Sequence, residues 1–400
     1  MSPDLVRFID KYFGIPLCFV FSIINMPFKQ LAAKRKKPPK KAIFIELSEM
    51  GSTIIAYSGI MKFKKKFPDC ETYFLIFNKN KESVELLNIF PNTHILTISD
   101  KGLVPFLRDC LKFFSFCLTN RISVVFDLEL FSRATALISL FSLAKHKVGF
   151  HKCTAEGLYR GHFFTHNVFY NTHVHMVHNF HSLFDCYIND LNYLNKKNTE
   201  ENEIEIPNFP FKQEVLAKFK QQIDTQNKTL IINPNAGMLL PIRNWETEKF
   251  AKVADYMATK YNMKIVIVGL PIAKKDAEQI RSKMNNKELF IDLTGKTKNI
   301  NELVHVLQCG DILLTNDSGP AHFAALTDTN IITIFGPETH ELYGPLSTKS
   351  YPLFAKFACS PCLSARNHRK TKCTDNKCIQ AISAEDVIKV IEEKILPNLG

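Results

Sequence analysis

The stretch from Leu314 to Pro345 reads LTNDSGPAHFAALTDTNIITIFGPETHELYGP and contains two strand-to-turn-to-helix transitions in succession. The first apolar strand ends at Thr315, a polar turn follows, and a helix opens near Gly319. The next apolar strand ends at Phe335 and leads into a second polar loop. Strands that alternate with helices in this way are typical of a parallel sheet covered by helices.

The first of these turns has the features of an anion site. Free N–H groups at the start of a helix bind phosphate, and Gly319 lets the backbone approach a ligand closely. His322 stands about one helical turn further on, where it would face the same ligand. The alternative is an ordinary helix capped by Asp317 or Ser318, because both residue types are common N-caps.

The same alternation extends along most of the chain. Short apolar runs are separated by stretches with helical periodicity, which predicts two successive parallel α/β domains with a ligand crevice at the carboxyl ends of the strands. The runs read as strands are Ala42–Leu47, Thr72–Phe77, His94–Ile98, Ser123–Asp127, Thr229–Asn233, Lys264–Gly269, Asp311–Thr315 and Asn330–Phe335.

The length of 400 residues suits two domains. We expect a first domain over residues 42–194 and a second over 228–400. The polar stretch 195–227 between them lacks clear periodicity and is predicted to be a linker. Residues 1–41 form a hydrophobic and basic extension.

This extension has the composition of a membrane anchor. An uncharged apolar stretch from Phe13 to Phe28 is followed by a cluster in which six of eight residues, Lys34 to Lys41, are Lys or Arg. The stretch is short for a spanning helix, and the charge follows it, unlike in a secretory signal peptide. We expect a shallow anchor whose basic cluster faces an anionic inner leaflet; the alternative is a hydrophobic helix packed on the protein itself.

The formal net charge of +12 predicts an anionic partner. No basic surface interleaved with aromatic residues and no nucleic-acid-binding motif is apparent outside the basic cluster, so nucleic acid is not the expected partner. The composition, 46% hydrophobic and 22% charged, is that of a globular protein.

The eleven cysteines do not follow the pattern of a disulfide framework, and several stand singly in apolar runs, which favours a cytosolic protein. A late loop, 359–378, is richer in cysteine and also holds Arg366, His368, Arg369 and Lys370, which would suit an anionic acceptor. Its four cysteines would form a small structural zinc site, remain reduced thiols, or serve a redox or disulfide role. They are Cys359, Cys362, Cys373 and Cys378.

The motifs together resemble a known family. The sequence DSGPAH from Asp317 to His322, followed by the FGP that ends at Pro337, resembles the hallmark of the heptosyltransferases, the ADP-heptose:lipopolysaccharide glycosyltransferases of glycosyltransferase family 9. The segments 292–297, 233–237 and 243–245 are similar to further elements of that family. The resemblance extends over roughly residues 42–395 and marks a divergent branch.

The resemblance implies the GT-B architecture, in which two Rossmann-like domains face a central cleft, and an inverting glycosyltransferase that needs no metal ion or cofactor for catalysis. The implied donor is a nucleotide diphosphate sugar, by family default ADP-heptose, and the implied acceptor is a glycolipid or lipopolysaccharide core. The enzyme would then work at the cytoplasmic face of the bacterial inner membrane as a peripheral or monotopic protein.

The resemblance also implies which residues bind the donor. Arg243 would contact the diphosphate, where a fixed cation offsets the charge that builds up on the leaving group. Turn amides would come from the segment 235–237, and the DSGPAH segment would border the sugar and diphosphate. The full set is Asn235, Ala236, Gly237, Arg243, Thr294, Lys296, Asp317, Ser318, Gly319 and His322.

The acceptor side departs from the family pattern. The family has an Asp directly after the Gly of the first strand-to-helix loop, where it acts as the general base, but here Gly51 is followed by Ser52. A serine hydroxyl is a poor base at neutral pH, and Glu49 is the nearest carboxylate, so we expect Glu49 to deprotonate the acceptor. Glu129 and Arg133, beside the end of another strand, are further candidates for binding the acceptor.

The departure at Ser52 leaves two alternatives open. The first is a scaffold protein that binds nucleotide sugars and has lost its catalytic base. The second is another enzyme of the same architecture, such as a nucleotide-sugar epimerase, which would act without an acceptor.

Overall fold

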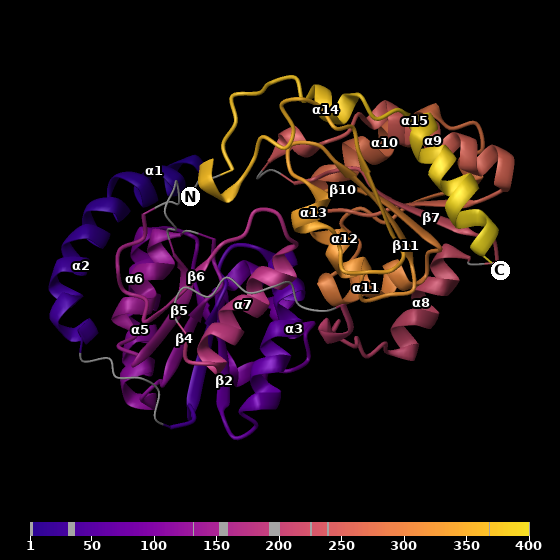
Figure 1. The fold of residues 1–400 in the computed structure, drawn as a ribbon. Helices are drawn as coiled ribbons and strands as arrows, with labels where there is room; N and C mark the ends of the chain where they lie inside the picture. Colours follow the sequence, from indigo (N-terminus) through magenta and orange to yellow (C-terminus); the bar gives the residue numbers. More distant parts are fainter. Residues whose placement is uncertain are drawn as a thin grey trace. The chain divides into compact units, whose positions relative to one another are not determined.

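Two six-stranded parallel sheets organise the chain, one in each of two units (Figure 1). The computed structural model describes residues 3–30, 37–130, 132–151, 159–191, 201–224, 226–237, 240–367 and 369–399. The first unit contains the chain up to Pro207 together with the short segment Ala365–Arg369, and the second unit contains the remainder.

The first sheet has the strand order β3-β2-β1-β4-β5-β6. Its strands are β1 (Lys41–Ile45), β2 (Glu71–Phe77), β3 (Ile95–Ile98), β4 (Val124–Asp127), β5 (His146–His151) and β6 (His166–Phe169). The helices of this unit are α1 (Pro3–Tyr12), α2 (Gly14–Gln30), α3 (Met50–Lys66), α4 (Lys81–Glu85), α5 (Leu103–Asn120), α6 (Arg133–Phe141) and α7 (Met176–Ile188).

Phenylalanine fills much of the first core. Phe44 on β1 is fully buried, and its ring centroid lies 5.7 Å from that of Phe63 on α3 and 5.8 Å from that of Phe184 on α7. The central strands β1 and β4 are buried along almost their whole length because helices cover both faces of the sheet. The 33 phenylalanines of the sequence therefore serve in part as packing residues in this core.

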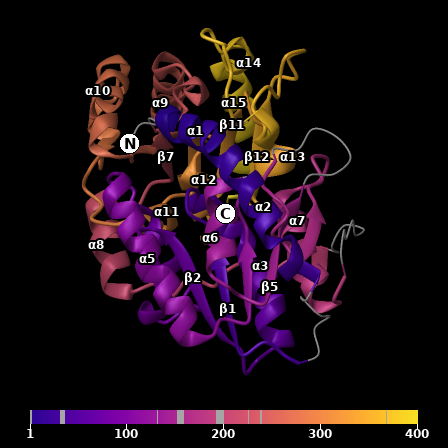
Figure 2. The ribbon, with the colours of Figure 1, turned by 90° about the vertical axis from the view of Figure 1, so that its left-hand side faces the viewer.

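The N-terminal helices α1 and α2 pack against α6 on one side of the first unit (Figures 1 and 2). Asp10 on α1 accepts hydrogen bonds from the backbone N–H groups of Arg133 and Ala134 and forms an ion pair with the Arg133 side chain. Cys18 on α2 is fully buried against a cluster that contains Phe163 and Phe164. One side of this extension thus packs on the protein itself, which was one of the two alternatives predicted for it.

The outward side of α2 is apolar and exposed. The segment Arg7–Pro27 is long and apolar enough to cross a membrane by length and composition, and most of it is not buried. Packing on the protein and contact with a membrane are therefore compatible, because packing against α6 uses only one side of α2.

The second sheet has the order β12-β11-β10-β7-β8-β9. Its strands are β7 (Thr229–Asn233), β8 (Lys264–Ile267), β9 (Phe290–Asp292), β10 (Ile312–Asn316), β11 (Asn330–Phe335) and β12 (Ser350–Phe354). The helices are α8 (Gln213–Ile223), α9 (Thr247–Tyr261), α10 (Lys274–Lys283), α11 (Ile300–Gln308), α12 (Gly319–Ala324), α13 (His340–Tyr343), α14 (Lys377–Gln380) and α15 (Ala384–Val390), which continues as a π-helical turn over Ile391–Ile395.

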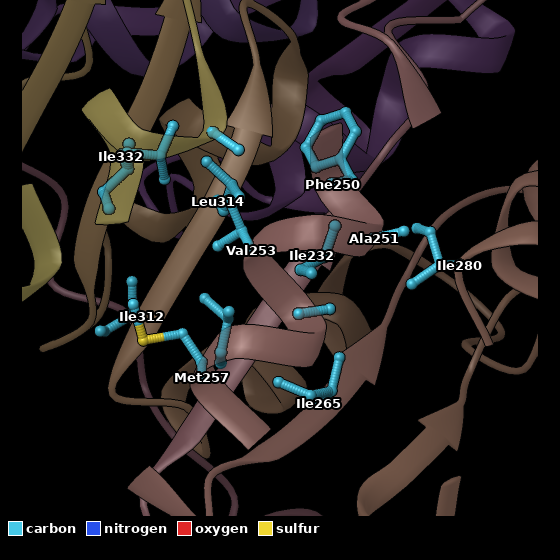
Figure 3. Packing of buried hydrophobic residues seen from close by; sticks show 14 of the residues in the cluster. Ile232, Phe250, Ala251, Val253, Met257, Ile265, Ile280, Ile312, Leu314 and Ile332 are labelled. Carbon is cyan, nitrogen blue, oxygen red and sulfur yellow. The ribbon is translucent and has the colours of Figure 1, made fainter. Parts of the chain in front are cut away.

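Figure 3 shows the core on one face of this sheet. Ile232, Leu314 and Ile332 project from neighbouring strands toward Phe250 and Val253 of α9, and all five side chains are buried. The helical spacing that the sequence showed in α9 thus marks the face that packs on the sheet.

Two features of the fold differ from the sequence expectation. The stretch predicted as a linker contains α8, because Leu216, Phe219 and Ile223 give this segment a buried apolar face that its polar composition obscured. Strands β5, β6, β9 and β12 were not predicted. Strands β5 and β6 carry histidines that interrupt the apolar pattern even though most of their residues are buried, β9 has only three residues, and β12 contains a proline.

The contact between α3 and α7 gives a test of this packing. A Cβ at Gly59 on α3 would lie 2.5 Å from Cδ2 of Phe184 on α7. Alanine normally stabilises a helix interior relative to glycine, but here Gly59→Ala should destabilise the protein by about 1–3 kcal/mol through overpacking. Urea unfolding measures the change, and Thr259→Ala on the exposed side of α9 is the control. A more stable Gly59→Ala variant would show that the two helices are not packed this closely.

Candidate active site

All strands of the second sheet are parallel, so the loops that follow them meet at one edge. The loop after β7 carries the segment 235–237 and Arg243, and the loop after β9 carries Thr294 and Lys296. The DSGPAH segment forms the loop after β10 and the start of α12. The loop after β11 adds Glu338 and Thr339. Every predicted donor-binding residue therefore lies at the carboxyl edge of this sheet.

Arg243 is the cation of this edge. Its Nη1 lies 3.3 Å from Oδ2 of Asp317 and 3.3 Å from Oε2 of Glu338. The Arg243 side chain is only 13% exposed, and both carboxyl groups are more deeply buried. A buried guanidinium needs such partners, because an unpaired charge in this environment would be very costly.

Two nitrogens at this edge keep unused hydrogen-bonding capacity. Within the part of the chain that the structure describes, Nε of Arg243 and Nδ1 of His322 are buried without a hydrogen-bond partner. Buried polar atoms in native proteins are nearly always paired, so an unpaired one in a candidate site points to a missing ligand. Burial also lowers the pKa of His322 to about 4, and its imidazole is therefore neutral at physiological pH.

Glu338 has the opposite perturbation. Burial, followed by the charge of Asp317, raises the pKa of Glu338 to about 8, although Arg243 opposes the shift. Glu338 is thus mostly protonated at pH 7, and the cluster of Arg243, Asp317 and Glu338 carries a net charge close to zero rather than −1. A neutral cluster of this kind admits an anionic ligand more readily than an acidic one would.

The alternative of an ordinary capped helix does not match the structure. The Ser318 hydroxyl donates to the backbone oxygen of Asn316 at 3.0 Å and makes no capping hydrogen bond to α12. Asp317 pairs with Arg243 instead of capping the helix. Because α12 has only six residues, the charge of Arg243 contributes more to an anion site here than the helix dipole.

The position of Arg243 is fixed by a network behind it. The side-chain amide of Asn316 donates to the Pro234 oxygen at 2.9 Å, and its side-chain oxygen accepts from the Trp245 backbone N–H at 2.8 Å. Trp245 is buried against Phe250, with ring centroids 4.9 Å apart. The loop that carries Arg243 is therefore attached to the end of β10 on one side and to the core on the other.

The turn amides differ from the expectation. The Ala236 N–H donates to Oδ1 of Asn244 at 2.7 Å, and the Gly237 N–H donates to Oδ1 of Asn235 at 2.8 Å. Both N–H groups are thus used within the turn, and Asn235 also donates to Asp276. A donor would reach these amides only by displacing the two asparagine side chains.

Thr294 and Lys296 lie in a tight turn after β9. The Thr294 hydroxyl and N–H both donate to Oδ1 of Asp292, at 2.6 and 2.8 Å. Gly295 between them has a φ of +68°, and its N–H donates to the Gly269 oxygen at 2.8 Å. Lys296 is exposed and donates to the Asp292 backbone oxygen at 2.5 Å. The turn therefore lies at the sheet edge as predicted, but its polar groups are hydrogen-bonded within the turn.

In the first unit, Glu49 precedes α3 at its N-terminus, and Gly51 and Ser52 lie in the first turn of that helix. Oε2 of Glu49 accepts from the Ser52 hydroxyl at 3.0 Å. Oε1 of Glu49 is ion-paired with Arg369, which the late cysteine-rich loop contributes to this unit. The expected base is therefore present at the end of β1, but it is held by two neighbours.

A second pair of carboxyls lies next to Glu49. Glu46 is buried, and its pKa is raised well above the usual range by that burial and then by the charge and hydrogen bond of Glu129. Oε1 of Glu129 accepts from the backbone N–H groups of Leu47 and Ser48, both at 2.9 Å. Glu129 therefore holds the loop after β1 in place, and the acceptor-binding role expected for it is not supported by these contacts.

The acceptor role expected for Arg133 is not supported either. Its side chain is 3% exposed and forms an ion pair with Asp10 at 2.8 Å. Arg133 thus attaches helix α1 to α6. The sequence could not reveal this pairing because the two residues are more than 120 positions apart.

The arrangement of the late cysteines gives no support to the zinc alternative. Among the described residues, no group of three or more His, Cys, Asp and Glu side chains could hold a metal ion, and no disulfide is formed. Burial raises the pKa of Cys378, and the neighbouring thiols Cys362, Cys359 and Cys373 add to the shift. The four thiols are thus neighbours without a ligating geometry; His368 in the same loop lies outside the described residues.

Glu46 and Glu338 were not assigned a role from the sequence, and the pairing of Arg369 with Glu49 was not predicted. Glu46 looked like an ordinary residue at the end of a strand, and Arg369 was one of several basic residues in the late loop. Glu338 follows directly after the FGP motif, and this position at the end of β11 was the one sequence signal for it.

Comparison with known proteins agrees with these motifs. The sequence model of Glycosyltransferase family 9 (heptosyltransferase) matches residues 128–372. The chain is 25% identical over 318 residues to the "Lipopolysaccharide core heptosyltransferase OpsX" of Haemophilus influenzae, covering 78% of this chain and 82% of that protein. It is 24% identical over 373 residues to the "Lipopolysaccharide heptosyltransferase 1" of Campylobacter coli, covering 88% of this chain and 98% of that protein.

A shorter match has a higher sequence identity. The chain is 30% identical over 140 residues to the "Lipooligosaccharide heptosyltransferase 2" of Haemophilus influenzae, which is 34% of this chain and 40% of the length of that protein.

The fold resembles solved heptosyltransferases. The structure of the Escherichia coli ADP-heptose lipopolysaccharide heptosyltransferase II matches with a TM-score of 0.66 at 16% identity, covering 90% of this chain and 100% of that chain. An Escherichia coli heptosyltransferase solved with ADP matches with a TM-score of 0.61 at 14% identity, covering 88% and 99%.

At these identities the structural likeness bears on the fold alone. The two parallel six-stranded sheets and the likeness to these structures confirm the predicted fold class, a GT-B architecture with two Rossmann-like domains. The family match covers more than half of the chain and includes the DSGPAH and FGP motifs. The chain therefore belongs to glycosyltransferase family 9, the heptosyltransferase family.

Proposed function

We propose that this protein is an inverting glycosyltransferase that transfers a sugar from a nucleotide diphosphate sugar to a membrane-associated glycan. ADP-heptose is the proposed donor and a lipopolysaccharide core the proposed acceptor, because relatives that match most of this chain carry the name lipopolysaccharide heptosyltransferase. The observation that carries the proposal is the buried Arg243, whose Nε has no hydrogen-bond partner among the described residues, together with His322 at the same sheet edge, whose Nδ1 has none there either.

In the proposed reaction, the acceptor hydroxyl oxygen forms a bond to the anomeric carbon while the bond from that carbon to the diphosphate oxygen breaks. Negative charge grows on the leaving diphosphate, and the fixed guanidinium of Arg243 stabilises it. His322 is neutral and donates a hydrogen bond to the same group. We propose that Arg243 takes the place that a divalent metal ion has in metal-dependent transferases, so that catalysis needs no metal.

The acceptor proton passes to Glu49 in this proposal. Both oxygens of Glu49 have partners, but a carboxylate oxygen accepts two hydrogen bonds, so the acceptor hydroxyl can add to the existing ones. Arg369 and Ser52 fix the orientation of the carboxylate. General-base catalysis depends on such orientation more than on base strength alone.

We further propose that the protein works at the cytoplasmic face of the inner membrane. The exposed apolar side of α2 and the basic cluster from Lys34 to Lys41 support this location, because they pair an apolar anchor with charges that suit anionic lipids.

Removal of the Arg243 side chain tests the donor site. Arg243→Ala should weaken ADP binding roughly 30-fold or more, because truncating a buried, hydrogen-bonded charge costs about 2 kcal/mol or more. Calorimetric titration measures the affinity, and Arg281→Ala on the exposed surface of α10 removes the same charge as a control. Equal ADP affinity in Arg243→Ala and wild type would place the diphosphate elsewhere.

The raised pKa of Glu338 predicts a pH dependence of donor binding. A bound diphosphate favours protonated Glu338, so affinity is full below pH 8 and falls as Glu338 ionises above it. ADP affinity should drop about 10-fold between pH 7 and pH 9, as expected for linkage to one proton. Glu338→Gln should remove this decrease. A flat profile in the wild type would show that Glu338 does not face the diphosphate.

Replacement of Glu49 tests the catalytic base. Glu49→Gln should lower kcat about 100-fold or more while ADP affinity stays within about twofold, because a general base contributes mainly to the chemical step. Ser52→Ala removes one hydrogen bond to the same carboxylate and should have a much smaller effect. Unchanged turnover in Glu49→Gln would rule out its role as the base, and absence of turnover with every donor would favour the scaffold alternative.

A further inference from the structure

Most large apolar side chains of helix α2 face outward, which is the reverse of the usual arrangement in a soluble protein. Its polar residue Ser22 faces the protein, where its hydroxyl lies 3.3 Å from the Tyr159 hydroxyl and accepts from the His162 N–H at 2.9 Å. The large apolar residues face outward. The exposed ones from the end of α1 onward are Tyr12, Phe13, Ile15, Leu17, Phe19, Val20, Ile23, Ile24 and Met26.

Helix α5 exposes a second apolar stripe. Val104, Leu107, Leu111 and Leu118 follow a helical spacing of three, four and seven residues, so they share one side of the helix. Each of these side chains is at least half exposed, between 50% and 77%. Cys110, Phe113 and Cys117 form the buried side of the same helix. Four exposed aliphatic residues in one row exceed the scattered apolar residues that are normal on a soluble surface.

The two apolar regions are joined by aromatic contacts. The ring of Phe21 on α2 lies 4.9 Å from that of Phe141 at the end of α6, and Phe141 lies 5.6 Å from Phe114 on α5. Phe114 continues the spacing of the exposed stripe on α5, which is therefore turned toward α6 and α2. Figure 2 shows α2, α6 and α5 on the same side of the first sheet. We call the exposed sides of α2 and α5 together the apolar face.

Cations border the apolar face. Arg108 and Lys112 on α5 have side chains that are 63% and 71% exposed, and they lie next to the stripe on the helix surface. In the sequence, α2 is followed by the six Lys and Arg residues between Lys34 and Lys41. An apolar surface with a basic border matches a bilayer that has anionic headgroups.

We propose that α2 and α5 form one surface that inserts side-on into the headgroup region of an anionic bilayer, so that the first domain is docked on the membrane by two helices. The proposal rests on the proposed function, because a transferase that acts on a membrane-bound glycan must reach its acceptor at the bilayer. It extends that function by assigning the membrane contact to α5 as well as to the N-terminal extension.

The packing of α2 favours this side-on position over a helix that crosses the membrane. A Cβ at Gly14 would lie 2.9 Å from Cβ of Arg133, so α2 approaches α6 very closely at that point. Crossing the bilayer would break this contact and expose the buried Cys18 and the hydrogen bonds of Ser22. A side-on position keeps all of them and still covers the outward apolar residues with lipid.

Vesicle flotation of the full chain tests the proposal. The probe is a vesicle of phosphatidylethanolamine and phosphatidylglycerol, with pure phosphatidylcholine vesicles as the neutral comparison. The variant carries Leu107→Glu and Leu111→Glu, two exposed positions on α5. The control carries Leu270→Glu and Ile272→Glu, exposed positions of the second unit with the same change in charge. Circular dichroism and ADP titration of each protein report folding and the donor site separately.

We expect wild type and control to float with the anionic vesicles and the α5 variant to partition at least about 10-fold more weakly, because both lost leucines leave the lipid contact. Equal flotation of the α5 variant and wild type would overturn the role of α5. If instead the wild type fails to float and sediments as a dimer that the α5 variant converts to monomers, the apolar face is an interface between two copies. Intact ADP binding in either case would leave the proposed donor site standing.

A second readout places the stripe in the lipid. The sequence has a single tryptophan, the buried Trp245, so Leu111→Trp adds one exposed indole over a constant background. Brominated lipids should quench the emission of this added indole and should leave a Leu270→Trp control unchanged. Absence of quenching in a vesicle-bound Leu111→Trp protein would contradict the insertion of α5.

Discussion

The buried ion-pair cluster of Arg243, Asp317 and Glu338 is the interaction on which the donor site depends. It exists because β7, β10 and β11 are parallel neighbours, so the loops that carry these three side chains end at one edge of the sheet. A guanidinium at this depth is tolerated only with compensating charge. The protein supplies two carboxyl groups, and burial raises the pKa of one of them, Glu338, which reduces the negative charge at this edge. Arg243 is thereby held in place by both carboxyl groups, and its positive charge remains available to attract an anionic ligand.

The first domain contains a cluster of carboxyl groups whose negative charges must likewise be compensated. Glu46, Glu49 and Glu129 gather at the ends of β1 and β4, where three ionised carboxylates would repel one another. Two effects relieve this repulsion: the pKa of Glu46 is raised, and Arg369 forms an ion pair with Glu49. Glu129 is held by backbone N–H groups of the loop after β1. The base proposed for the reaction therefore depends on a residue that lies 320 positions away in the sequence.

Local sequence patterns predicted the parts of the fold that depend on local chemistry. The bounds of β7 and β11 agree with the predicted strands Thr229–Asn233 and Asn330–Phe335, because strands buried on both faces are mostly apolar. Strands β5 and β6 escaped prediction since His146, Lys147 and His166 are buried polar residues that only the tertiary structure pairs. The π-helical end of α15 likewise lies in a segment whose sequence reads as ordinary helix.

The candidate site shows the same division. The DSGPAH and FGP motifs indicated the donor edge, since each stands at a strand end and the strand order follows from a general rule for parallel sheets. Which side chains pair there was not visible, because Arg243 and Asp317 are 74 positions apart and Glu338 is 95 from Arg243. Arg133 and Glu129 were assigned to the acceptor for their positions at a strand end, and their partners Asp10 and the Leu47 N–H come from distant parts of the chain.

A crystal structure of the protein with ADP would show directly whether the cluster of Arg243, Asp317 and Glu338 is the donor site. We expect diphosphate oxygens within hydrogen-bonding distance, about 3 Å, of Nε of Arg243 and Nδ1 of His322, two buried nitrogens at the donor edge that lack a partner among the described residues. Both nitrogens should then be satisfied, with Glu338 still next to Arg243. A diphosphate bound away from Arg243, or an Arg243 Nε that stays unpaired in the complex, would contradict the central claim that this cluster is the donor site.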